Sequence, residues 1–152
     1  MKTILAPIDF SEVSEAVVSE ATTLARGSGG RVVLLTIIQP PVITSEYAPM
    51  MENLTEILAA GEKAAGKNLT KIEERLQAES IPVETLQLSG APVAHIIEQA
   101  QKFEANYIVM GSHGHTAVYD LLVGSTTHGV LKRAKCPVII VPPLKVKAPK
   151  KK

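Results

Sequence analysis

The chain has 152 residues, which is enough for one domain with a sizeable core. Hydrophobic residues make up 45% and charged residues 20%, and no apolar stretch is long enough for a membrane span, so the composition indicates a globular protein. Five of the 16 basic residues lie within 145–152. This leaves 11 basic against 15 acidic side chains in residues 1–144, which disfavours a dedicated nucleic-acid site.

The first half of the chain predicts strands and helices in alternation. Residues 2–9 form an apolar strand, and Asp9 or Ser11 can cap the helix that follows, in which apolar residues recur every three or four positions. Glycines at 27, 29 and 30 end this helix. Residues 31–38 are a β-branched strand typical of a sheet covered on both faces. We expect a long connection at 39–56, which either covers a ligand or binds a partner or is a flexible surface loop, and a helical pattern from Leu54 to Glu79.

The second half continues the alternation. It predicts a strand at 81–88, a helix starting near Pro92, a short strand ending on Gly111, a helix from about Ser125 to Ala134 and a last strand at 137–141. Strands separated by helices imply right-handed crossovers. The expected fold class is therefore α/β: a single doubly wound, mainly parallel sheet with helices on both faces. We place this domain at residues 1–144, followed by a disordered Lys-rich tail at 145–152.

A split glycine motif follows the fourth predicted strand. Gly111-Ser112-His113-Gly114 is separated by nine residues from Gly124-Ser125-Thr126. A glycine at a strand end lets the backbone approach a phosphate, and a helix that opens with Gly-Ser-Thr offers unpaired amides, hydroxyls and a positive dipole end. The chain has neither a Gly-x-x-x-x-Gly-Lys-Ser/Thr loop nor a compact Gly-x-Gly-x-x-Gly turn. Ser112 also breaks the His-x-Gly-His signature of nucleotidylyltransferases, which disfavours adenylyl transfer.

The sequence resembles the universal stress proteins over residues 2–142. Their ATP-binding signature, Gly-x-x-Gly, nine residues and Gly-Ser/Thr, is present without a gap. The opening Ile-Leu-Ala-Pro-Ile-Asp, the Met-Gly-Ser-His-Gly segment and the closing Cys-Pro-Val-Ile-Ile-Val also match. The resemblance implies a Rossmann-like five-stranded sheet of order 3-2-1-4-5, with a crevice between strands 1 and 4.

The resemblance also implies a nucleotide site and a homodimer. ATP is the expected ligand, with Mg or Mn on its phosphates. The site residues carried over are Pro7 and Asp9 (adenine and ribose), Ile37 and Met110 (base), and Gly111, Gly114, Gly124, Ser125 and Thr126 (ribose and phosphates). The family pairs its last strand across a two-fold axis, so we expect a dimer interface at Val138, Ile139, Ile140 and Val141.

Positive charge is scarce near the expected phosphates. The spacer 115–123 contains no Lys or Arg, so we expect triphosphate binding that is weaker or more pH-sensitive than in relatives with a basic spacer. His113 is equally well read as a phosphate contact or as a solvent-facing loop residue, and His115 and His128 are the other nearby candidates. No histidine pair has helical ligand spacing beside a carboxylate, so we expect no protein-bound metal site.

The expected protein is an ATP-binding regulator of the stress response, with slow or no ATP hydrolysis, because no residue is an evident general base. Two alternatives remain open: an ATP hydrolase or adenylate-transferring enzyme on the same fold, and a nucleotide-free dimeric interaction module. The protein partner is unknown, and no membrane partner is expected. The single cysteine, Cys136, fits a cytoplasmic protein and is expected to be a small buried residue rather than a nucleophile.

Overall fold

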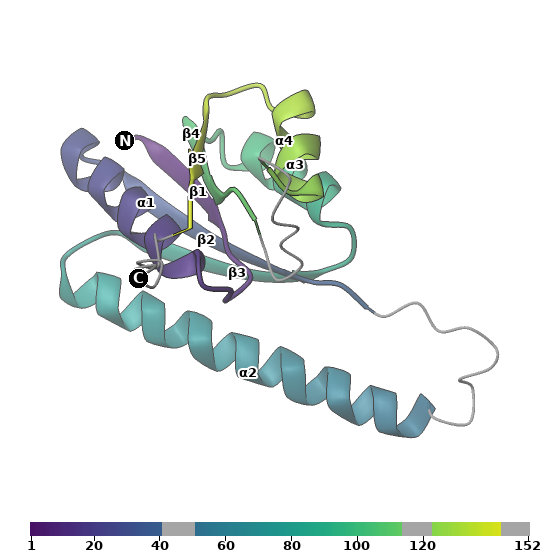
Figure 1. Ribbon diagram of the computed structural model, residues 1–152. Coiled ribbons are helices and arrows are strands. Elements are labelled where there is room, and N and C mark those ends of the chain that lie inside the picture. The colour runs from purple at the N-terminus through teal and green to yellow at the C-terminus, as the bar shows by residue number, and fades with distance from the viewer. Residues whose placement is uncertain (41–50, 114–122, 144–152) are drawn as a thin grey trace, which may run out of the picture.

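The computed structural model describes residues 1–40, 51–113 and 123–143, and it confirms the alternation of strands and helices (Figure 1). Because each apolar run is bounded by Gly, Pro or polar residues, the elements are well separated along the chain. In chain order they are β1 (Thr3–Pro7), α1 (Ser14–Ser28), β2 (Arg31–Ile38), α2 (Met51–Ala78), β3 (Val83–Ser89), α3 (Pro92–Lys102), β4 (Tyr107–Gly111), α4 (Ser125–Arg133) and β5 (Val138–Val141).

The five strands form one parallel sheet of order β3-β2-β1-β4-β5, as predicted. The chain moves outward from β1 through β2 to β3, then returns to place β4 on the other side of β1. The strand order therefore reverses between β1 and β4. In sheets of this kind, ligands bind in the crevice at the carboxyl ends of the strands on either side of such a switch point.

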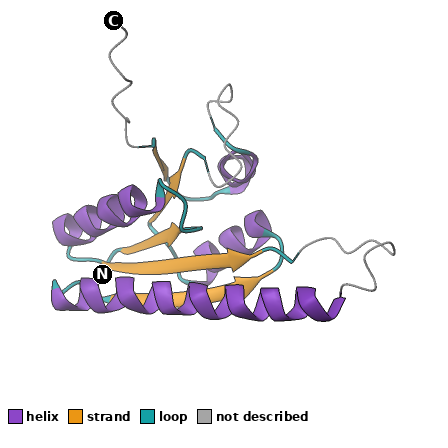
Figure 2. Cartoon of the chain, turned by 60° about the horizontal axis from the view of Figure 1, so that its bottom comes forward, coloured by secondary structure: helices purple, strands orange, loops and turns teal. Residues whose placement is uncertain are grey.

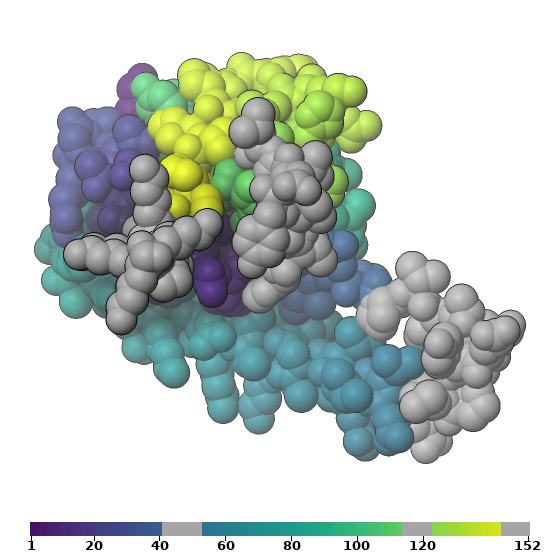
Figure 3. Space-filling view, viewed as in Figure 1, coloured from purple at the N-terminus to yellow at the C-terminus, as the bar shows by residue number. Residues whose placement is uncertain are grey.

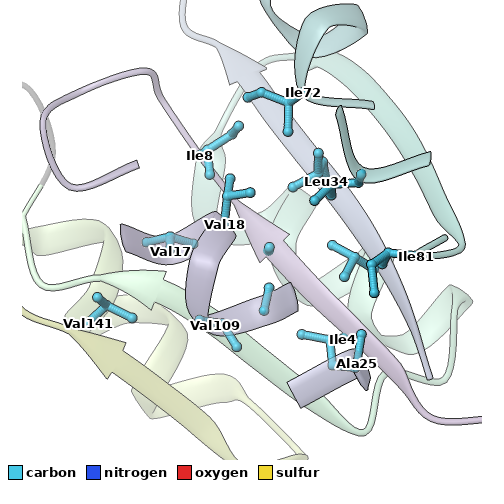
Figure 4. Close-up of a cluster of buried hydrophobic side chains, with 14 of the residues drawn as sticks. Ile4, Ile8, Val17, Val18, Ala25, Leu34, Ile72, Ile81, Val109 and Val141 are labelled. Carbon is cyan, nitrogen blue, oxygen red and sulfur yellow. The ribbon is translucent and has the colours of Figure 1, made fainter. Parts of the chain in front are cut away.

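Helices cover both faces of the sheet, and the strand residues alternate between them. Ile4 and Leu34 pack with α1 and α2 in one apolar cluster (Figure 4), whereas Leu5 and Leu35 pack with α3 and α4 in a second cluster. Successive strand side chains point to opposite faces, so a continuous apolar run is required to fill both layers. The two clusters pack on opposite faces of the sheet and hold in place the strand ends that border the crevice.

Several element boundaries differ from the sequence-based expectation: β1 is Thr3–Pro7 rather than 2–9, and β3 is Val83–Ser89 rather than 81–88. Helix α2 begins at Met51 rather than near Leu54, so residues 51–56 are helical and only 41–50 of the expected connection lie outside the described residues. The helix runs along the sheet, and its N-terminal end extends past the strands (Figures 1 and 2). No helix among the described residues combines the length and the apolar character needed to cross a membrane.

The start of α1 is also a correction. The helix begins at Ser14 with Val13 as its N-cap residue, and no side chain caps it, so neither Asp9 nor Ser11 has the expected capping role. The end of α1 agrees with expectation more closely: Gly29 takes the left-handed conformation (φ 64°) that ends many helices.

Candidate functional site

A cavity of about 720 Å³ opens at the carboxyl ends of β1, β2 and β4. Its volume falls within the range typical of small-molecule sites, and its position is the switch point of the sheet. Gly114 lies outside the described residues. All nine other residues of the expected nucleotide site line this one cavity: Pro7, Asp9, Ile37, Met110, Gly111, His113, Gly124, Ser125 and Thr126.

One end of the cavity is apolar. Leu35 and Ile37 reach it from β2, Met110 from β4, and Ile96 and Pro92 from the start of α3. Such walls accept a flat heteroaromatic ring by burying its two faces. The sequence analysis named Ile37 and Met110 but missed the α3 residues, because an apolar helix face by itself signals only core packing.

The turn after β1 carries Asp9 to the rim of the cavity. Its Oδ1 accepts a hydrogen bond from the Ser11 amide at 3.0 Å and another from the Ser14 hydroxyl at 3.3 Å. Phe10, between Asp9 and Ser11, has the left-handed backbone (φ 61°) that a non-glycine residue rarely adopts. Asp9 therefore holds the turn that leads into α1, which is a different structural role from the expected helix cap.

Hydrogen bonds tie the polar end of the cavity to the sheet. The Ser112 amide donates to the Val141 carbonyl at 2.9 Å, and the Gly124 amide donates to the Ser112 carbonyl at 2.6 Å. The Thr127 hydroxyl donates to the Gly111 carbonyl at 2.8 Å. These contacts place the N-terminus of α4 beside the end of β4, at a fixed distance from the apolar end.

His113 lies beside these bonds. Its Nδ1 is 3.0 Å from the hydroxyl of Ser112, a residue that is buried. The contact orients the imidazole on the cavity lining. Its role toward a ligand remains a proposal.

The two described glycines of the motif differ in what the protein requires of them. A Cβ built on Gly111 would collide with the Cγ1 of Val13, so the start of α1 packs directly on this backbone. A Cβ on Gly124 would lie 3.5 Å from the Ser112 carbonyl oxygen, an ordinary contact, and its backbone (φ −72°, ψ 169°) suits any residue. Glycine at 111 thus has a packing reason that the sequence analysis did not anticipate, whereas nothing in the described fold requires glycine at 124.

Charge is sparse in the described lining of the cavity. Asp9 is its only side chain with a full charge, and His113 is its only other titratable group. No three His, Cys, Asp or Glu side chains gather to hold a metal anywhere in the described ranges. The described part of the site therefore offers shape, backbone amides and hydroxyls rather than charged side chains.

Cys136 lies away from this cavity, half-buried in a second hollow of about 190 Å³ between α3 and the end of α4. Burial raises the pKa of its thiol above the ordinary value. Because the thiolate is the nucleophile, we expect slow alkylation by iodoacetamide at neutral pH, faster reaction as the pH rises into the alkaline range, and acceleration on unfolding. Mass spectrometry of the alkylated chain measures this; equal rates in native and unfolded protein would contradict it.

Strand β5 forms one edge of the sheet. In Figure 3 the yellow atoms near the C-terminal end of the described chain lie at the surface beside the yellow-green atoms of α4. The Pro137 carbonyl accepts from Ile108 and the Val141 carbonyl accepts from Ser112, so residues 137, 139 and 141 turn their backbone groups toward β4. By alternation, Val138 and Ile140 direct their amides and carbonyls outward, where another strand can bind them.

Fold and cavity together define a class: a doubly wound α/β domain with a ligand-sized cavity at its switch point. The model of the universal stress protein family matches residues 1–142, and the chain belongs to this family. A universal stress protein of Methanocaldococcus jannaschii is 31% identical over 151 residues, covering 99% of this chain and 84% of its own.

Two solved structures extend the comparison. UspA from Lactobacillus plantarum superposes with a TM-score of 0.79 at 28% identity, covering 92% of this chain and 97% of its own. A universal stress protein solved in complex with cAMP gives a TM-score of 0.63 at 25% identity, covering 93% of this chain and 96% of its own. The predicted family and Rossmann-like fold are thus confirmed.

Proposed function

We propose that this universal stress protein binds an adenine nucleotide, with ATP as the expected ligand, in the cavity at its switch point. The observation that carries the proposal is that the nine described residues of the expected site line one cavity of suitable volume. Asp9 and Gly111 are far apart in the sequence, and only the parallel pairing of β1 with β4 brings their ends together.

The two ends of the cavity match the two ends of a nucleotide. The base lies against Ile37 and Met110 at the apolar end, and the ribose lies near Pro7 and Asp9. The phosphates lie at the start of α4, where Gly124 leaves space and the free amides attract anions. A relative solved with cAMP supports an adenosine ligand on this fold. A Mg or Mn ion would be held by the phosphates and water, with Asp9 as the one carboxylate in the described lining.

Calorimetric titration of nucleotide-free protein with Mg–ATP tests the proposal, and Mg–GTP serves as the matched control for the base. We expect saturable binding of ATP at about micromolar concentration, equivalent to about −8 kcal/mol, with GTP weaker. Ligand binding to the native state should also raise the midpoint of thermal unfolding. The absence of both heat and thermal stabilisation at millimolar ATP would contradict nucleotide binding.

The proposed role of the bound nucleotide is regulatory. A cytoplasmic protein whose surface changes with nucleotide occupancy can report the state of the cell to a partner during stress. Slow or absent hydrolysis fits this role, because the nucleotide-bound state then lasts long enough for a partner to recognise it. The described lining offers no Lys or Arg to stabilise a departing phosphate.

We also propose a homodimer through β5, paired along the outward backbone groups of Val138 and Ile140. Val138→Pro removes one outward amide without touching a hydrogen bond to β4, and we expect it to turn a micromolar dimer into a monomer in light-scattering measurements. Val138→Thr is the control: it keeps the amide and should stay dimeric. A monomeric wild type would contradict the proposal outright.

A further inference from the structure

The start of α4 has hydrogen-bond donors for one phosphate group. The first helical bond of α4 runs from the His128 amide to the Gly124 carbonyl at 2.9 Å, so the amides of residues 125–127 have no helical acceptor. Ser125 and Thr126 add hydroxyls on the cavity lining. Three adjacent amides at a helix N-terminus suit a single tetrahedral anion.

The neighbouring donors are already committed. The Gly124 amide binds the Ser112 carbonyl, and the Thr127 hydroxyl binds the Gly111 carbonyl. These two groups fix the end of α4 in place, so neither of them is available to a second or third phosphate among the described donors.

No Lys or Arg compensates the negative charge of further phosphates in the described lining, where His113 is the one basic side chain and Asp9 adds a negative charge of its own. The sequence from Ser112 to Val123 also contains no Lys or Arg. The basic residues of α4, Lys132 and Arg133, lie in its last turn, about 10 Å along the helix from Ser125. That separation exceeds the Debye length of about 8 Å at physiological salt, so their attraction is largely screened.

We infer that this site recognises the adenosine monophosphate part of its ligand and discriminates little between AMP, ADP and ATP. The inference rests on the proposed nucleotide binding and assigns the selectivity of that same site. The first phosphate is bound by the amides and hydroxyls at the start of α4, and the later phosphates extend into water with their Mg ion. Occupancy then follows the total adenylate concentration rather than the ratio of ATP to AMP.

Titration of the full chain with adenosine, AMP, ADP and ATP, with Mg present and at physiological ionic strength, tests the inference. We expect AMP to bind about tenfold or more tighter than adenosine, the value of one charge-assisted contact. ADP and ATP should fall within about threefold of AMP. ATP that binds about tenfold or more tighter than AMP would overturn the inference while leaving nucleotide binding intact, whereas no binding of any of the four would contradict the proposed function itself.

A gain-of-charge variant provides the second arm. Ser125→Lys places an ammonium group at the polar end of the cavity, and we expect the ratio of ATP to AMP affinity to rise about fivefold to tenfold. The control is Leu131→Lys, which adds the same charge two turns along α4 at a side chain that is already 46% exposed. It should leave the ratio unchanged. If the wild type bound ATP and AMP equally and Ser125→Lys did not raise the ratio of the two affinities, the lack of a cation would not be the cause of the weak discrimination.

Discussion

Gly124→Asp should abolish nucleotide binding and leave the fold intact. The substitution puts a carboxylate where the proposed phosphate meets the start of α4, so steric overlap and like-charge repulsion act together. We expect the affinity for Mg–ATP to fall by about 100-fold or more, equivalent to about 3 kcal/mol. The fold has room for the change, because a Cβ at this position meets only ordinary contacts and the backbone is extended. Calorimetry measures the affinity, and thermal unfolding without nucleotide checks the fold.

Two matched variants separate the causes. Gly124→Ala adds the Cβ without the charge and should weaken binding by a smaller factor. His128→Asp adds the charge one turn along α4 at an exposed side chain that is not on the cavity lining, and it should change the affinity by about threefold at most. If Gly124→Asp bound ATP like the wild type, the phosphates would have to lie elsewhere.

The strands and the parallel sheet could be predicted from sequence because the patterns that indicate them lie within short segments of the chain. Continuous apolar runs such as Arg31–Ile38 predict strands covered on both faces, and the alternation of strands with helices predicts a parallel sheet. The strand order was available only through the resemblance to a family. Alternation alone is compatible with several orders, and which strands become neighbours is decided by packing between distant segments.

The turn after β1 could not be predicted in detail. Asp9 in front of an apolar helix pattern reads as a cap, because capping is what an aspartate most often does there. In the structure, Phe10 takes a left-handed conformation, and Asp9 is bonded to the amide of Ser11 and the hydroxyl of Ser14 instead of capping a first-turn amide of the helix. No property of a phenylalanine signals positive φ, so only the tertiary structure reveals it.

The cavity lining was predicted on one side only. The residues named from sequence belong to the split glycine motif or to strand ends, whereas Ile96 and Pro92 reach the cavity because α3 packs over β2. Their pattern is that of any amphipathic helix. A ligand site formed by three strand ends and the starts of three helices has no compact sequence pattern beyond its glycines.

Glycine can be needed at these positions for two different reasons, ligand contact and helix packing, and the spacing of the motif does not distinguish them. Gly124 leaves space that no atom of the described residues fills, which is what a ligand contact requires. Gly111 leaves space that Val13 fills, which is what helix packing requires. A motif shared by relatives can thus combine a ligand constraint with a fold constraint, and the two respond differently to the same substitution.

Gly111→Ala should destabilise the protein by about 1–3 kcal/mol, because the new Cβ overlaps Val13, a buried side chain. Val13→Ala alone should cost about 1–2 kcal/mol by removing buried methyl groups. Together the two changes exchange volume between neighbours, so the double variant should be at least about 1 kcal/mol more stable than the sum of the single costs implies. Urea unfolding of the four proteins measures this coupling.

The same cycle links packing to ligand binding. Val13 and Gly111 both line the cavity, so a displaced α1 start should weaken nucleotide binding in Gly111→Ala and recover in the double variant. Strictly additive stabilities would show that α1 moves away from β4 without strain, and the packing role assigned to Gly111 would be wrong. Recovery of stability without recovery of affinity would instead assign Gly111 a direct ligand contact, because the Cβ itself would then be the obstacle.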